Sequence, residues 1–185
     1  MEAGMAAISE AERELGRVDA MVYAWVDPAM AERQPLAAMS EAEWAAKCEL
    51  PLRYARNFFK LAHAVLHEGG GDVVQLLPSL AMTGSDGLLP WAAAAEGQRS
   101  LGKAAARAWG RYPIRINTLA VQATLLAGLD PDVELERPGL PMTSLNAASS
   151  EMAPVAALLA TLLTPGFSSV TGTTIGGDGG RWMTP

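Results

Sequence analysis

Residues 73–121 read VVQLLPSLAMTGSDGLLPWAAAAEGQRSLGKAAARAWGRYPIRINTLAV, and this stretch decides the fold class. Val73–Leu77 is an apolar run with the length of a buried strand. Pro90–Gly110 is rich in alanine, the residue with the highest helix propensity. Ile114–Val121 is a second apolar run of strand length. A strand, a helix and a strand in this order are typical of a parallel sheet with helices on its faces.

The flanking sequence continues the same alternation. It predicts two further strands at Val18–Trp25 and Val170–Gly176, and two further helices at Ser9–Gly16 and Ser149–Leu163. Gly128–Asn146 contains several prolines and predicts an irregular loop. We therefore predict the α/β class, with a parallel sheet covered by helices on both faces, in one domain spanning residues 1–185.

A long helical region is predicted between Ser40 and His67. Ser40 and Glu43 have the spacing of a capping box, and Pro51 predicts a kink or a restart of the helix. A helix on the surface of a monomer normally needs one apolar stripe, which packs on the core. Two stripes predict that this helix is covered on two sides, by the core and by a second, unspecified element. The two stripes are Leu52, Ala55, Phe59, Ala62 and Leu66, and Leu50, Tyr54, Phe58, Leu61 and Val65.

The composition narrows the class of protein. Half of the 185 residues are hydrophobic and 18% are charged, which is typical of an ordered globular domain. No apolar run approaches the roughly 20 residues of a membrane span, and the N-terminus has no signal-peptide pattern. The single cysteine, Cys48, fits a reducing cytoplasm and predicts a small buried hydrophobic residue. The net charge of −6 argues against a nucleic-acid partner.

Five motifs, taken in order, resemble the C-terminal two-thirds of the short-chain dehydrogenase/reductase family. The resemblance covers nearly all of the chain and implies a truncated Rossmann-like sheet that lacks the first three strands of the dinucleotide-binding half. It also implies that Trp44 opens the family's fifth helix. The motifs are Val18–Val22, Trp44, Gly70–Val74, Ile114–Asn117 and Ser169–Gly172 with Asp178–Gly180.

The family's catalytic positions have lost their chemistry. The resemblance places the family's tyrosine on Trp91 and its lysine on Ala95, its serine on Ser79 or the preceding proline, and its asparagine on Pro51. Hydride transfer at a carbonyl needs a proton relay near neutral pH. An indole N–H only donates a hydrogen bond, and an alanine methyl group neither donates nor accepts one. We therefore expect no catalytic residue in this chain.

The cofactor contacts are altered as well. Gln122-Ala123 stands where the family has a proline-glycine beside the nicotinamide, and Tyr23–Val26 stands where it has asparagine-alanine-glycine. Gly176–Gly180 follows a strand and opens no helix, so it predicts a structural turn and not a phosphate loop. We expect no cofactor and no cofactor-binding residue in this chain. Without the missing strands, Val18–Trp25 would lie at an edge that must be covered or paired.

Two further patterns have competing interpretations. His63 and His67 have a metal-compatible spacing, but no clear third ligand accompanies them, so we predict no metal site. Arg99, Lys103, Arg107 and Arg111 form a basic stripe. This stripe is either a solvated or ion-paired helix face, or a patch for an acidic partner surface or for coenzyme A phosphates.

The resemblance implies association, because the family packs its fifth and sixth helices across a dimer axis. We therefore predict a non-catalytic pseudo-subunit in a heterotetramer with a full-length, active paralogue that binds NAD. The C-terminal tail, Gly177–Pro185, would shape the partner's substrate pocket. The predicted interface residues are Tyr54, Phe58, Leu61, Val65, Trp109 and Trp182.

A more specific resemblance is to inactive small subunits of two-component dehydrogenases that oxidise 2-[hydroxy(phenyl)methyl]succinyl-coenzyme A in anaerobic toluene degradation. Two alternatives stay open at this point. One is a stand-alone, homodimeric binding or regulatory protein that uses a crevice beside Ser79 and Trp91. The other is an enzyme with repurposed residues such as His63, His67 or Asp86.

Overall fold

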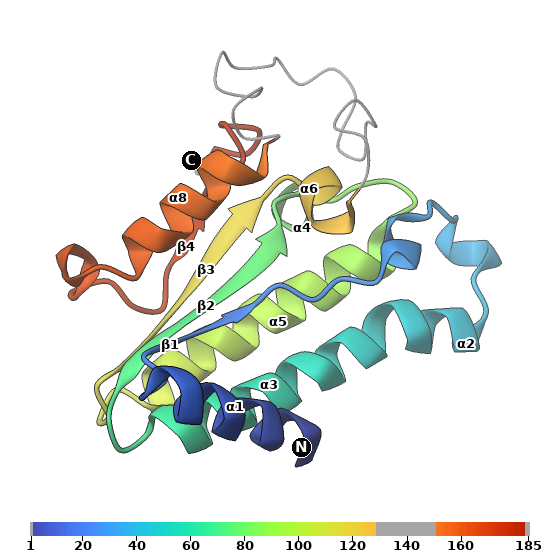
Figure 1. Ribbon diagram of the computed structural model, residues 1–185. Helices are drawn as coiled ribbons and strands as arrows, with labels where there is room; N and C mark the ends of the chain where they lie inside the picture. The colour runs from blue at the N-terminus through green and yellow to red at the C-terminus, as the bar shows by residue number, and fades with distance from the viewer. Residues whose placement is uncertain (1, 129–150, 184–185) are drawn as a thin grey trace.

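The computed structural model describes residues 2–128 and 151–183 of the chain (Figure 1). These residues form a four-stranded sheet with the order β1-β2-β3-β4, and every neighbouring pair is parallel. The central pair aligns Val73 with Ile116. The prediction of a parallel α/β sheet is confirmed. The strands are β1 (Ala20–Tyr23), β2 (Gly71–Pro78), β3 (Ile114–Val121) and β4 (Thr174–Gly176).

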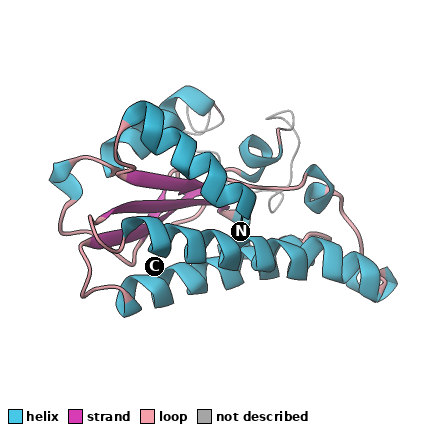
Figure 2. Ribbon diagram, turned by 60° about the horizontal axis from the view of Figure 1, so that its bottom comes forward, coloured by secondary structure: helices cyan, strands magenta, loops and turns pink. Residues whose placement is uncertain are grey.

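Helices cover both faces of this sheet, as Figure 2 shows. Alternate side chains of a strand point to opposite faces, so β2 and β3 each contribute to two apolar layers. One layer packs against α3 (Leu50–Leu66) and α5 (Leu89–Ala108) and contains Phe59, Ala62, Leu66, Val73, Ala106, Ile114 and Ile116. The other packs against α8 (Met152–Leu162) and contains Val74, Leu76, Leu119, Val121, Val155 and Leu162.

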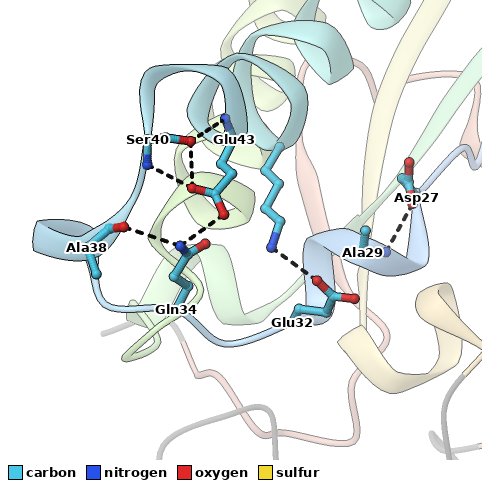
Figure 3. A network of polar contacts seen from close by, with 8 residues as sticks. Asp27, Ala29, Glu32, Gln34, Ala38, Ser40 and Glu43 are labelled. Atoms are coloured by element: carbon cyan, nitrogen blue, oxygen red, sulfur yellow. Dashed lines mark hydrogen bonds and ion pairs between the residues drawn. The ribbon is translucent and has the colours of Figure 1, made fainter.

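The capping box at Ser40 is confirmed (Figure 3). The Glu43 backbone N–H donates to the Ser40 hydroxyl oxygen at 3.3 Å, and the Glu43 carboxylate accepts from the Ser40 backbone N–H at 2.8 Å and from its hydroxyl at 2.6 Å. Gln34 donates to the same carboxylate at 3.1 Å. The hydrogen bonds from Ser40, followed by that from Gln34, lower the pKa of Glu43.

The helix that starts at Ser40 restarts at Pro51, as predicted. Helix α2 (Glu41–Trp44) continues into a π-helical segment, η3 (Ala45–Glu49), and then into α3, with Pro51 in its first turn. Pro51 lacks the N–H that would continue this hydrogen-bond ladder, and the chain forms the π-helical segment directly before it. Cys48, in the π-helical segment, is buried as predicted.

The two outer strands are shorter than predicted. The predicted strand Val18–Trp25 is wrong in its extent, because β1 holds four residues, and only Tyr23 among them is buried. Val22 is 40% exposed, since β1 is an edge strand with β2 as its one neighbour. Of the predicted strand Val170–Gly176, only Thr174–Gly176 forms β4. The residues before it are held by hydrogen bonds to a side chain of β3. Asn117 donates to the Val170 carbonyl at 2.9 Å and accepts from the Thr173 N–H at 3.3 Å.

The N-terminal helix is longer than predicted, and it covers part of the second stripe of α3. Helix α1 spans Glu2–Leu15, where Ser9–Gly16 was predicted. A Cβ added at Gly4 would lie 3.0 Å from Leu61, and Ile8 of α1 lines a groove together with Phe58. Helix α1 of the same chain therefore provides part of the additional cover that was predicted for this stripe.

The remaining helices follow the strands closely. α4 (Leu80–Thr83) follows β2 and α6 (Ala123–Ala127) follows β3. The predicted loop Gly128–Asn146 lies outside the described residues except for Gly128, which ends α6 with a φ of 64°. The predicted helix Ser149–Leu163 is observed as α8, with its first two predicted residues outside the described part. None of the described helices has the length and hydropathy needed to cross a membrane.

Candidate functional site

The four positions that correspond to the family's catalytic residues lie in the protein interior. Trp91 and Ala95 lie one turn apart near the start of α5, and their exposed fractions are 2% and 1%. Ser79, directly after β2, is 1% exposed, and Pro51 is buried in the first turn of α3. Since none of these side chains is open to solvent, all four contribute to the packed interior.

Trp91 belongs to an apolar cluster at the carboxyl ends of β2 and β3. In open α/β sheets, ligands bind in the crevice outside these strand ends. Here α4 supplies Leu80 and α6 supplies Ala123 and Ala127, which pack in the same cluster as the indole. The rest of the cluster comes from the segments on either side: Met30, Ala31, Cys48, Leu88 and Ala94. The space used by substrate in an open sheet is therefore occupied by side chains of this chain.

Two titratable groups in or near this cluster, Cys48 and Tyr23, have raised pKa values. Burial raises the pKa of the Cys48 thiol, and the charge of Glu49 raises it further. Burial, followed by the repulsion from Tyr54, raises the pKa of Tyr23 to about 12. The Tyr23 hydroxyl donates to the Pro51 carbonyl at 3.4 Å. Neither a thiol nor a phenol in this state supplies a nucleophile or a general base near neutral pH.

Among residues 2–128 and 151–183, the two that follow β3 do not fit a nicotinamide ring. The family's Rossmann-like architecture implies NAD, whose nicotinamide ring needs an open crevice beside the reacting groups. Gln122 and Ala123, at the corresponding point after β3, are each 1% exposed. Gly176–Gly180 forms a turn, as predicted, in which the buried Asp178 accepts from the Gly180 N–H at 3.0 Å and from the Trp182 N–H at 3.1 Å.

The two histidines belong to an aromatic cluster. The rings of His63 and His67 are stacked with centroids 5.5 Å apart, and His63 also contacts Trp109 at 4.9 Å and Tyr112 at 5.4 Å. Among the described residues, no group of three His, Cys, Asp or Glu residues could hold a metal ion. Asp86 is exposed in the loop between α4 and α5. The structure does not bring these three residues into one buried cleft.

A groove of about 520 Å³ separates the outer surfaces of α3 and α5, and we call it the α3–α5 groove. Apolar residues dominate its lining, with Phe59, Leu101 and Trp109 the largest. Arg56 and Lys60 bring positive charge to its α3 side. These two cations were not among the residues predicted from the sequence. The signal was available, because α3 has no acidic residue among its 17 residues.

The predicted interface residues do not share one surface. Trp109 lines the α3–α5 groove, whereas Tyr54 is 42% exposed on another side of α3 and contacts Trp25 with ring centroids 4.7 Å apart. The remaining four are only partly exposed. Phe58 and Leu61 lie near α1, Val65 packs against the core, and Trp182 is held in the turn at Asp178.

The predicted basic stripe divides in a similar way. Arg99 donates to the Glu96 carboxylate at 3.0 Å, and this hydrogen bond raises the pKa of Arg99. Arg111 lies beyond the end of α5 and places its guanidinium 4.9 Å from the centre of the Tyr112 ring. Lys103 and Arg107 stay exposed on α5. The stripe is thus part ion pair and part solvated face.

Comparison with known proteins agrees with this fold. A model of the family described as enoyl-(acyl carrier protein) reductase matches residues 1–181. Among solved structures, acetoin dehydrogenase YohF from Salmonella typhimurium is similar with a TM-score of 0.73 and 22% identity, over 98% of this chain and 71% of that chain. An oxidoreductase from Escherichia coli str. K-12 is similar with a TM-score of 0.71 and 22% identity, over 97% of this chain and 69% of that chain.

The match to the family model identifies the family, whereas the similar solved structures identify only the fold. At 22% identity, the solved structures show the fold alone. Curated proteins offer no match. The family model, in contrast, spans nearly the whole sequence. The chain therefore belongs to the short-chain dehydrogenase/reductase family.

Proposed function

We propose that this chain is a non-catalytic pseudo-subunit of an NAD-dependent short-chain dehydrogenase complex. The observation that carries the proposal is the burial of Trp91 and Ala95 at the positions of the family's tyrosine and lysine. A proton relay needs titratable groups that reach the substrate. An indole inside an apolar cluster and a buried methyl group serve packing instead.

The proposed partner is a full-length, active paralogue that binds NAD, and the assembly is a heterotetramer. The outer surface of α3 and α5 supports this choice, since it presents an apolar groove with Trp109 at one end. Exposed apolar surface rimmed by polar residues marks interaction sites. The C-terminal tail would contribute to the partner's substrate pocket, with Asp178 fixing the turn that leads into it.

The substrate proposed for the complex is 2-[hydroxy(phenyl)methyl]succinyl-coenzyme A, in anaerobic toluene degradation. This part of the proposal rests on the resemblance to the inactive small subunits of such dehydrogenases. It is tested by assaying the purified complex, and not the isolated chain, for NAD reduction with this thioester.

Co-expression tests the subunit role directly. The chain is produced with each full-length dehydrogenase paralogue from the same genome, with an affinity tag on the paralogue alone. We expect one paralogue to co-purify the chain at a fixed ratio and to lose stability or activity without it. Paralogues that are all fully active alone and recover none of the chain would overturn the proposal.

Two controls separate a pseudo-subunit from a repurposed enzyme. Isothermal titration of the isolated chain with NAD should show no binding. The double variant Trp91→Tyr with Ala95→Lys should show no NAD-dependent turnover, because the restored side chains enter the core and not an open crevice. Turnover by the isolated double variant would contradict the buried arrangement of these positions.

The homodimeric binding protein is the weaker alternative. It requires a crevice beside Ser79 and Trp91, yet both side chains are almost fully buried. A ligand there would have to displace Leu80 or Ala123 from the apolar cluster. Such displacement opens a gap in a close-packed interior and is therefore unfavourable.

A further inference from the structure

The charge on α3 and α5 is opposite in sign to that of the whole chain. The two helices together carry six lysine and arginine residues and one carboxylate, whereas the chain has a net charge of −6. The one carboxylate, Glu96, is already paired with Arg99. Within residues 2–128 and 151–183, no carboxylate forms an ion pair with the other five: Arg53, Arg56, Lys60, Lys103 and Arg107.

Three of these cations lie at the α3–α5 groove. Arg56 and Lys60 line it directly, one helical turn apart on α3. Arg107 lies one turn from Ala104, which lines the groove on the α5 side. An apolar floor with a charged, solvent-accessible rim is the usual anatomy of a protein–protein interface. The positive charge of the rim then favours docking of a surface with negative charge.

We propose that the α3–α5 groove docks an acidic partner surface with apolar side chains at its centre, and that its unpaired cations keep the chain from pairing with itself. The inference rests on the pseudo-subunit function and adds the chemistry of the partner. A symmetric dimer uses the same patch on both subunits. Arg56, Lys60 and Arg107 of one copy would then face the same three cations of the other copy, and such like-charge contact opposes association.

The chain itself provides a probe of defined composition. The variant Arg56→Glu, Lys60→Glu, Arg107→Glu presents the same groove with an acidic rim. All three side chains are exposed, so the variant should fold, and circular dichroism and thermal unfolding verify this. Mixed with the wild-type chain, the variant acts as the acidic partner that the proposal requires.

Analytical ultracentrifugation measures the three pairings at low and at high salt. At low salt we expect the mixed pair to associate at least about tenfold more tightly than either chain with itself. At roughly 1 M salt the Debye length falls to about 3 Å, and the preference should disappear. Wild-type self-association as tight as the mixed pairing, or no mixed pairing at all, would overturn the inference.

Two more variants keep the test decisive. The neutral set Arg56→Gln, Lys60→Gln, Arg107→Gln removes the repulsion without reversing it, so it should self-associate more tightly than the wild-type chain at low salt. This comparison applies even if the acidic variant does not fold. Arg13→Glu, an equally exposed change on α1, is the matched control and should leave all pairings unchanged.

The two proposals fail in different ways. A co-expressed paralogue complex that survives the charge reversal unchanged would overturn the inference and leave the pseudo-subunit function standing. A tight, salt-sensitive mixed pairing without any paralogue complex would overturn the pseudo-subunit function and support the acidic docking preference of the groove. In that case the groove selects acidic surfaces, but the chain is not a dehydrogenase subunit.

Discussion

The substitution Ala95→Lys distinguishes a filled interior from an open catalytic crevice. It restores the lysine of the family's catalytic set at a position that is 1% exposed. The ammonium group would be buried without a counter-ion, a defect that destabilises by about 3–5 kcal/mol. Overpacking by the longer side chain adds roughly 1–3 kcal/mol. Asp178, the one buried carboxylate among the described residues, already accepts from two backbone N–H groups.

The expected pH dependence has a definite sign. Burial lowers the pKa of the introduced lysine in the folded state, whereas the unfolded chain keeps a value near about 10.4. Between these two values the unfolded state binds the extra proton, so stability rises with pH by up to about 1.4 kcal/mol per pH unit. Urea unfolding followed by tryptophan fluorescence, repeated from neutral to mildly alkaline pH, measures both the loss and the slope.

Ala93→Lys is the matched control, because Ala93 is exposed two residues earlier in the same helix. A surface change of this kind should stay within about 0.5 kcal/mol of the wild-type stability at every pH. If Ala95→Lys proves as mild as Ala93→Lys and shows no slope, position 95 opens onto solvent. The argument that the catalytic positions have become core would then be refuted.

Three other predictions concern local structure. Ser40→Ala removes the capping box and should lower the free energy of unfolding by about 1 kcal/mol in urea unfolding. Because the pKa of Glu43 is lowered in the folded state, this loss should shrink as the pH falls through the folded-state pKa of Glu43. Gly102→Ala would place a Cβ 2.4 Å from the Gln75 amide nitrogen, so overpacking should lower the free energy of unfolding by roughly 1–3 kcal/mol. Asp178→Ala leaves two tail N–H groups unpaired, and limited trypsin digestion should release the C-terminal residues faster.

Each of these has a comparison that can contradict it. Ser169→Ala changes an exposed serine at which no helix begins and gives the reference for Ser40. Ser100→Ala is an exposed change on α5 and gives the reference for Gly102. Equal stabilities within either pair would contradict the cap or the packing contact. An unchanged digestion rate in Asp178→Ala would show that other contacts hold the tail.

Elements with a strong local signal could be predicted from the sequence. The run Ile114–Val121 became β3 at both predicted ends, because aliphatic and β-branched residues dominate it, as in a central strand buried on both faces. The capping box at Ser40 was predicted because its hydrogen bonds join residues three apart. Both features depend on neighbours in the chain, which the sequence displays directly.

Features that depend on long-range packing could not be predicted. The run Val18–Trp25 has the composition of a buried strand, yet β1 is an edge strand with a single neighbour, and only Tyr23 of its four residues is buried. The cover that α1 gives to Leu61 joins residues far apart in the sequence. The α3–α5 groove likewise needs both helices in place before Arg56 and Trp109 can line one surface.

Trp91 and Ala95 were predicted to stand at the positions of the family's tyrosine and lysine, and both side chains are buried in the interior. On α5, the sheet-facing side holds Trp91 and Ala95, while another side presents Leu101 to the groove. A side chain that fills the core fixes the helix, and a fixed helix presents its outer residues without the entropy loss of ordering them on binding. Inner changes such as Ala95→Lys should therefore alter the free energy of unfolding first. Outer changes such as Arg107→Glu should alter association while leaving unfolding unchanged, so the two properties can be measured separately on one helix.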